Sequence, residues 1–177
     1  MAPIIKNKKA FSLLELLVVI LIIAISITFG LPSLTEMVNN QRLKGTARDI
    51  FSIFKKAKQE AIRRNTNVVI SITPASYSPD GMKGSYLVFV DDGKGTGTAE
   101  NSILDGDEEI LTNVSMPQKV SLISSTFTGS PKTTAFNSRG LPTKLGDVRL
   151  RNSIRWYKIS LSIAGNVKMD ISKDDSW

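Results

Sequence analysis

The sequence predicts an α+β protein in which one long N-terminal helix packs on a globular domain of antiparallel β-sheets. Nearly all of the extreme apolarity lies in one run near the N-terminus, residues 11–34. An amphipathic helical pattern follows that run. The rest of the chain shows strand-like segments without the alternation of strands and helices that a parallel sheet requires. The length of 177 residues is enough for one domain with a buried core.

Composition argues against most enzyme classes. The chain contains no cysteine and no histidine, which excludes disulfides, thiolate and imidazole metal sites and the common histidine-dependent triads. Because no nucleophile lies beside a base either, we expect no enzyme activity, no catalytic residue and no cofactor. The formal charge of +7 weakly favours anionic partners such as nucleic acid or acidic lipid.

The N-terminal apolar run is long enough to cross a membrane. Between residues 11 and 32 its only charged residue is Glu15, and a transmembrane helix needs about 20 predominantly apolar residues. Residues 1–10 carry three lysines and no acid, a bias that retains the N-terminus in the cytoplasm. We therefore expect residues 11–34 to form the transmembrane half of the helix, with the rest of the chain on the other side.

Three interpretations of this N-terminus compete. A cleaved secretory signal has its small-residue cleavage site after the apolar run, whereas Ala10 precedes the run. A plain anchor does not explain Glu15, since a carboxylate costs roughly 2.5–3.5 kcal/mol at the centre of a membrane helix. The third interpretation is a prepilin leader. The segment KNKKAFSLLELL resembles the prepilin peptidase site, with a basic leader, a small residue, and then Phe and a Leu-rich run with Glu fifth.

This resemblance to type IV pilins implies processing and assembly. It implies that prepilin peptidase cleaves between Ala10 and Phe11, removing residues 1–10, and that the new amine of Phe11 is N-methylated. Family members usually carry Gly where this chain has Ala10. A carboxylate in lipid needs a cation or gives up its charge, and the resemblance implies that Glu15 pairs with the Phe11 amine of a neighbouring subunit. The alternative is a Glu15 side chain that reaches the membrane surface.

The helical pattern continues beyond Pro32 as an amphipathic half, residues 35–65. Apolar residues recur there at intervals of three and four, widened by Phe51 and Ile62: Leu43, Ala47, Ile50, Phe54, Ala57 and Ala61. We predict one helix from about residue 12 to about residue 65. We expect a kink at Pro32, where many pilins also carry proline, because proline removes a backbone donor and clashes with the preceding turn.

Residues 66–177 are predicted to form a β-rich globular domain. The predicted strands are Asn67–Thr73, Tyr86–Val90, Lys119–Ser124, Thr133–Phe136, Val148–Arg151, Tyr157–Ile163 and Asn166–Ile171. The last two form a hairpin with its turn at Ala164–Gly165, and alternate residues from Tyr157 to Ile163 are expected on one face. Residues 91–109 are rich in glycine and acids but lack the EF-hand spacing, so we expect a solvated loop and no metal site.

Motifs along the globular part narrow the family. The segments KQEAIRRN (58–65), YLVFVDDG (86–93), FNSRG (136–140) and the terminal hairpin resemble, in this order, the GspH/FimT group of minor pilins and pseudopilins. The resemblance implies a pilin-like fold and a structural subunit in the initiation or tip complex of a type IV pilus or a type II secretion pseudopilus. The implied partners are other pilin or pseudopilin subunits, prepilin peptidase, an inner-membrane assembly platform and the lipid bilayer. The implied location is the bacterial inner membrane, crossed once with the globular domain in the periplasm, and then the filament.

A DNA-binding minor pilin acting in DNA uptake is the alternative. Some FimT-like members bind DNA through a C-terminal G-R-x-R motif, but the corresponding residues 165–168 here are GNVK, without the arginines. A nearby basic cluster offers contacts to phosphates: Arg149, Arg151, Arg155, Lys158 and Lys168. Trp156 and Tyr157 add stacking on single strands in this alternative. We favour a charged sheet surface with two core aromatics, because basic surfaces are common. Loss of the three leader lysines also lowers the formal charge from +7 to +4, which weakens the electrostatic case for DNA.

Overall fold

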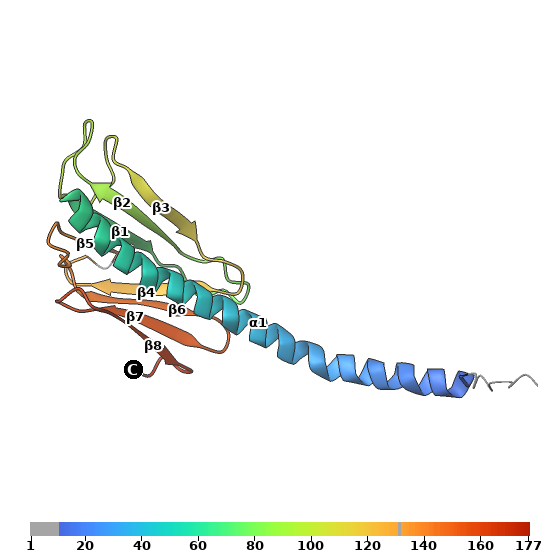
Figure 1. Ribbon diagram of the computed structural model, residues 1–177. Coiled ribbons are helices and arrows are strands. Elements are labelled where there is room, and N and C mark those ends of the chain that lie inside the picture. Colours follow the sequence, from blue (N-terminus) through green and yellow to red (C-terminus); the bar gives the residue numbers. More distant parts are fainter. Residues whose placement is uncertain (1–10, 131) are drawn as a thin grey trace, which may run out of the picture. The chain divides into compact units, whose positions relative to one another are not determined.

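The computed structural model describes residues 11–130 and 132–177 of the chain. They form one helix, α1 (Leu13–Arg64), followed by eight strands (Figure 1). The strands are β1 (Asn67–Thr73), β2 (Ser85–Asp91), β3 (Ile110–Ser115), β4 (Ser121–Phe127), β5 (Thr133–Phe136), β6 (Gly146–Arg151), β7 (Trp156–Leu161) and β8 (Val167–Ser172). The α+β class and the long N-terminal helix predicted from the sequence are confirmed.

The chain divides into two compact units, residues 1–38 and residues 39–177, and α1 contributes to both. In the first unit, every side chain from residue 11 onward whose exposure the structure describes is exposed. The second unit contains the rest of α1 and all the strands. The helix continues without a break through residues 30–32, and the kink at Pro32 stays a prediction.

A left-handed residue ends α1. Asn65 has φ of 53°, a conformation that asparagine tolerates better than most residues. The amide of Thr66 donates to the carbonyl of Ala61 at 3.3 Å, and the amide of Asn65 donates to the carbonyl of Ile62 at 3.4 Å. This pair of bonds is the Schellman arrangement, which satisfies carbonyls left free by the last turn. The chain can therefore reverse at once into β1.

The globular unit contains two four-stranded antiparallel sheets. The strand orders are β3-β2-β1-β5 in the first sheet and β4-β6-β7-β8 in the second, and Figure 1 shows the second half of α1 lying over both. Phe54 of α1 is fully buried, and its ring centroid lies 6.4 Å from that of Phe127 on β4 and 6.5 Å from that of Phe136 on β5. One helical side chain thus contacts both sheets.

The predicted apolar stripe forms the helical side of this core. The six residues spaced by three and four are all at most 1% exposed: Leu43, Ala47, Ile50, Phe54, Ala57 and Ala61. Ile62 is 50% exposed, so its predicted place in the stripe is wrong, and Ile53 is buried instead. Ile62 follows Ala61 directly rather than at an interval of three or four residues, so its side chain points toward the edge of the apolar face and not toward its centre.

The strand predictions need three corrections. β3 was missed because Ile110–Ser115 has a mixed polar sequence and all its residues are exposed or half-exposed. β4 begins at Ser121 rather than Lys119, since Lys119 has φ of 65° and its amide bonds to the carbonyl of Asp80 in a loop. β7 ends at Leu161, and Ile163 lies in the turn to β8 with 76% of its surface exposed.

Candidate functional site

The N-terminal segment begins with a capped helix. Ser12 precedes α1, and its Oγ accepts a hydrogen bond from the amide of Leu14 at 3.3 Å. Its carbonyl accepts the amide of Leu16 at 3.2 Å. Ser12 is therefore the N-cap of α1. Phe11 lies one residue before the cap and is 78% exposed, whereas Ala10 lies outside the described residues.

Glu15 lies in the first turn of α1 and is exposed. Its spacing from Ser12 is that of a capping box, but its carboxylate makes no hydrogen bond or ion pair with a described residue. The free amides at a helix N-terminus favour a negative charge in the first turn. The fold thus tolerates a carboxylate at this position and leaves it available to a partner outside the subunit.

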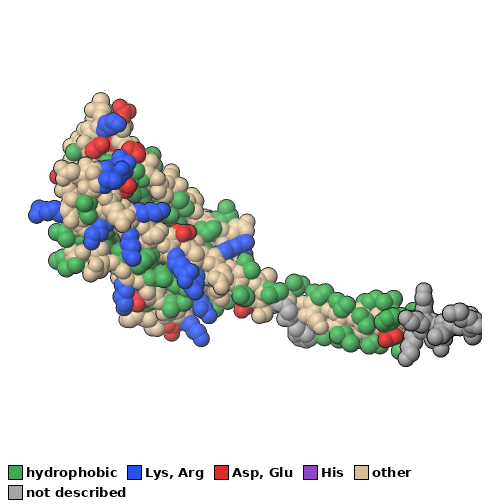
Figure 2. Space-filling view, in the orientation of Figure 1, with side chains coloured by type: hydrophobic (Ala, Val, Ile, Leu, Met, Phe, Trp, Pro, Cys, Tyr) green, Lys and Arg blue, Asp and Glu red, His purple; other side chains and the backbone are tan. Residues whose placement is uncertain are grey.

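The helix that carries Glu15 is long and apolar enough to cross a membrane, and none of its most apolar stretch is buried within the chain. The exposed apolar side chains follow one another from Leu13 to Ile27, and Figure 2 shows how densely they cover this segment. Exposed apolar surface of this extent marks a membrane or protein contact. The intrahelical bonds satisfy the backbone polar groups, as a lipid environment requires.

The basic cluster proposed for DNA is assembled by the structure, but most of its cations are engaged. Arg149 on β6 lies opposite Lys158 on β7. The Nε of Arg149 donates to Asp147 at 2.9 Å and its Nη1 to Asp175 at 3.2 Å. The hydrogen bond to Asp147 is the main reason why the pKa of Arg149 is raised. The Nζ of Lys158 lies 4.5 Å from the ring centroid of Trp177.

The remaining members of the cluster differ in their surroundings. Arg151 stacks on the rings of Tyr77 and Trp156, at 4.0 and 4.5 Å from their centroids. Lys168 pairs with Asp170 at 2.9 Å. Arg155 is exposed and forms no ion pair with a described residue. Tyr157 is only 6% exposed, so the alternative in which it stacks on a nucleotide is wrong.

The acidic loop, residues 91–109, is organised by its own carboxylates. Asp91 is fully buried and accepts the amide of Ser102 at 2.8 Å. Glu108 is 8% exposed and accepts the amides of Gly93 at 3.1 Å and Asp105 at 3.2 Å. The prediction of a fully solvated loop is therefore wrong for these two acids. No cluster of three acids suited to a metal ion occurs among the described residues.

Sequence reasoning missed an ion network at the end of α1. Arg64 donates to Glu109 at 2.6 and 3.0 Å and to Glu60 at 2.9 Å. The hydrogen bonds to Glu109 and then to Glu60 raise the pKa of Arg64. Arg64 lowers the pKa of Glu109, and Arg63 followed by Arg64 lowers the pKa of Glu60. The Glu60–Arg64 pair was detectable from its spacing of four residues, but nothing in the sequence indicated Glu109.

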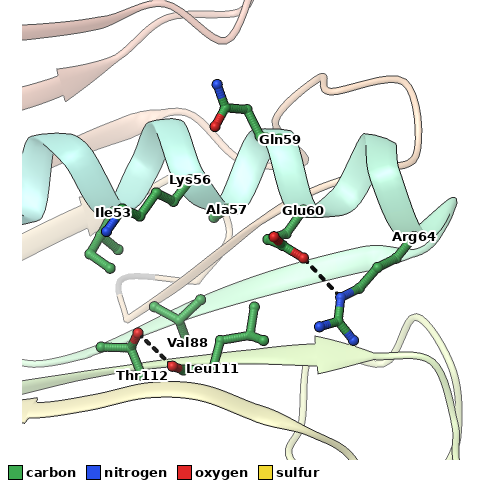
Figure 3. Close-up of a pocket in the computed structure, with 9 residues that line it drawn as sticks. All are labelled: Ile53, Lys56, Ala57, Gln59, Glu60, Arg64, Val88, Leu111 and Thr112. Carbon is green, nitrogen blue, oxygen red and sulfur yellow. Dashed lines mark hydrogen bonds and ion pairs between the residues drawn. The ribbon is translucent and has the colours of Figure 1, made fainter.

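A groove beside this network lies between the end of α1 and strands β2 and β3 of the first sheet. Its volume is about 420 Å³, and Figure 3 shows its lining. The lining residues are Ile53, Lys56, Ala57, Gln59, Glu60, Arg64, Val88, Leu111 and Thr112. Arg64 holds the start of β3 against the helix at one end of the groove, through Glu109. The groove contains no nucleophile–base pair, and it offers contact surface rather than chemistry.

Comparisons with known proteins agree with these features. A family model described as type II transport protein GspH matches residues 46–165, and a prokaryotic N-terminal methylation motif matches residues 5–31. No curated protein sequence gives a significant match.

Among solved structures, the type IV minor pilin FimU of Pseudomonas aeruginosa has a TM-score of 0.51 and 10% identity, covering 76% of this chain and 92% of that one. The minor pseudopilin EpsH from the Type 2 Secretion System of Vibrio cholerae has a TM-score of 0.47 and 10% identity, covering 76% of this chain and 99% of that one. The likeness to FimU shows the fold alone. The GspH match, which covers more than half of the chain, shows the family: this chain belongs to the GspH family and is a pilin-like structural subunit.

Proposed function

We propose that this chain is a minor pilin or pseudopilin that is stored in the bacterial inner membrane and assembled into a type IV pilus or a type II secretion pseudopilus. In this proposal, prepilin peptidase cleaves after Ala10, and the new amine of Phe11 is N-methylated. Residues 11–34 anchor the subunit, residues 35–65 connect it to the globular domain, and residues 66–177 lie in the periplasm. The subunit acts in the initiation or tip complex and receives its neighbours at an inner-membrane assembly platform.

The observation that carries the proposal is the carboxylate of Glu15, which pairs with no described residue and lies close to the new N-terminus. Cleavage creates a positive amine on Phe11, four residues before Glu15, in a segment where every apolar side chain whose exposure the structure describes is exposed. A carboxylate in lipid is stabilised by a cation. An amine from an adjacent copy of the motif supplies that cation, so pairing between subunits lowers the free energy of assembly.

Substitution of Glu15 tests this role. We expect Glu15→Ala and Glu15→Gln to abolish incorporation into filaments sheared from cells, with unchanged accumulation in the membrane. Glu15→Asp keeps the charge and is expected to retain part of the incorporation. Leu16→Ala is the matched control, because it alters the next side chain without touching the carboxylate. Normal incorporation of Glu15→Ala would refute the proposed role.

A further inference from the structure

The charges of this chain are separated between one acidic segment and an otherwise basic protein. The acidic loop, residues 91–109, holds seven of the 16 acids and one of the 23 bases, a formal charge of −6. The other residues therefore carry a formal charge of +13, or +10 once residues 1–10 and their three lysines are removed. Figure 2 shows acidic side chains close together at one tip of the globular unit. Such an arrangement favours contacts that place the acidic part of one molecule on a basic part of another.

The acidic loop presents an apolar tip flanked by exposed acids. Ile103 is 62% exposed and Leu104 is 38% exposed. Asp92, Glu100 and Asp107 are exposed and form no ion pair with a described residue. The loop is held in shape by the amides that bond to Asp91 and Glu108, and by the bidentate contact between Glu109 and Arg64. This tip therefore needs little ordering when it binds.

A basic groove lies on the other side of α1, between the helix and the β7–β8 turn. This lysine groove has a volume of about 440 Å³ and is lined by Lys55, Lys58, Gln59, Ile62, Gly165, Asn166 and Val167. It contains two lysines and no acid. The Nζ of Lys55 lies over the ring of Phe51, 4.4 Å from its centroid, and neither lysine forms an ion pair with a described residue. Ile62 adds an apolar surface that is 50% exposed.

The lysine groove is also formed in advance. The Nζ of Lys58 donates to the carbonyl of Ala164 at 3.5 Å, which ties the turn to the helix. Within the turn, the amide of Gly165 donates to the carbonyl of Ser162 at 2.9 Å. Gly165 has φ of 71°, and a Cβ there would lie 2.9 Å from the carbonyl oxygen of Gly140. A side chain at residue 165 would therefore disturb this end of the groove.

We propose that the acidic loop of one copy of this chain docks into the lysine groove of a second copy. Ile103 then packs against Ile62 and Val167, while Glu100 and its neighbouring acids pair with Lys55 and Lys58. The two surfaces belong to different parts of the molecule, so the contact is heterologous. The inference rests on the proposed function, because it supplies a lateral contact between subunits that share a membrane.

The absence of cysteine allows a clean cross-linking test. Two differently tagged full-length copies are expressed together in membranes, one with Ile103→Cys and the other with Asn166→Cys, and are then oxidised. We expect a disulfide-linked dimer that carries both tags. Met82→Cys in place of Ile103→Cys is the matched control, since Met82 is also 62% exposed and lies in a different loop. Equal cross-linking of the control pair would overturn the proposal.

Charge reversal identifies the contact. We expect Lys55→Glu in the groove copy to lower the yield of the linked dimer about tenfold, and Glu100→Lys in the loop copy to restore it. Neither side chain forms a hydrogen bond or ion pair with a described residue, so the fold should persist. A yield of linked dimer that changes with neither Lys55→Glu nor Glu100→Lys would overturn the proposal. The cross-linking assay does not need a filament. Normal incorporation of the chain into filaments without the cross-link would refute this inference alone. A cross-link in a chain that is never processed at Phe11 would refute the proposed function alone.

Discussion

Replacement of Phe54 by alanine should uncouple the two sheets from the helix. Phe54 has no exposed surface and contacts one aromatic ring in each sheet. Truncation of a buried phenylalanine to alanine costs about 3–5 kcal/mol through lost burial and the cavity that remains. The ring pairs with Phe127 and Phe136 each contribute roughly 0.5–1.5 kcal/mol beyond area burial, which places the expected loss in the upper part of that range.

Thermal unfolding of the full chain in mild detergent measures this loss. For a chain of this size, each 1 kcal/mol lowers the melting temperature by about 2–4 °C, so we expect Phe54→Ala, with a loss of about 4–5 kcal/mol, to melt roughly 8–20 °C lower. Near-UV circular dichroism follows the loss of packing around the aromatic residues. The helix in the first unit should keep its far-UV signal at the new midpoint, because none of its side chains contributes to the core.

Phe51→Ala is the matched control. Phe51 lies three residues earlier on the same helix, so the same Phe→Ala change alters helix propensity equally in both variants. Phe51 differs from Phe54 in being only partly buried. We expect the control to lose about 1 kcal/mol or less, since a partly exposed ring leaves no closed cavity. Equal destabilisation by the two substitutions would refute the placement of Phe54 between the sheets.

Three further predictions follow from the same structure. Gly45→Ala should raise stability by about 0.5–1 kcal/mol, because glycine weakens a helix interior and a Cβ at Gly45 meets nothing within 4 Å; a lower melting temperature would contradict this. Arg64→Gln should destabilise the chain at neutral pH, and the gap from the parent should shrink as the pH falls. The pKa values of Glu60 and Glu109 are lowered in the folded chain. The stability that their ion pairs with Arg64 contribute is therefore complete above the ordinary glutamate pKa of 4.5, and it is lost as the pH falls through the lowered pKa values. A stability difference between variant and parent that stays constant between about pH 7 and pH 3 would contradict this prediction. Finally, the full chain should not retard a single-stranded DNA oligonucleotide at about 50 mM salt, since most of the cluster around Arg149 is engaged; retardation that Arg149→Gln abolishes would favour the DNA alternative.

Local patterns account for the parts of the fold that the sequence predicted well. The helical spacing from Leu43 to Ala61 identified the buried face of α1. The helix was predicted to end at about residue 65, and the structure shows that Asn65 takes the left-handed conformation there. The strand Asn67–Thr73 was predicted with its observed bounds because four of its seven residues are β-branched and apolar and a turn precedes it.

Features that depend on tertiary contacts were missed. β3 pairs with β2 through backbone hydrogen bonds, and its mixed polar and apolar sequence does not indicate this pairing. The partner of Arg64 lies 45 residues away along the chain, so no local spacing indicates it. Ile163 continues the alternation of apolar and polar residues along β7, but the strand has already ended there, because the turn that contains Gly165 begins before Ile163. Asp91 and Glu108 looked like solvated loop acids, and only the folded loop shows that they bond to backbone amides.

Candidate site residues near the N-terminus came from a motif rather than from geometry. Phe11 and Glu15 were identified by their order within the apolar run, and the structure adds the Ser12 cap and shows that Glu15 pairs with no residue in the described part of the chain. The basic cluster was proposed from the sequence, and only the fold shows that Asp147 and Asp175 pair with Arg149 and that Lys158 lies over the ring of Trp177.

The most direct test of the account is the intact mass of the protein recovered from membranes of cells with and without prepilin peptidase. The account predicts a chain that lacks residues 1–10 and carries one methyl group on Phe11, found only when the peptidase is present. An uncut chain in both strains would contradict it, because without the Phe11 amine Glu15 has no cation of the proposed kind to pair with.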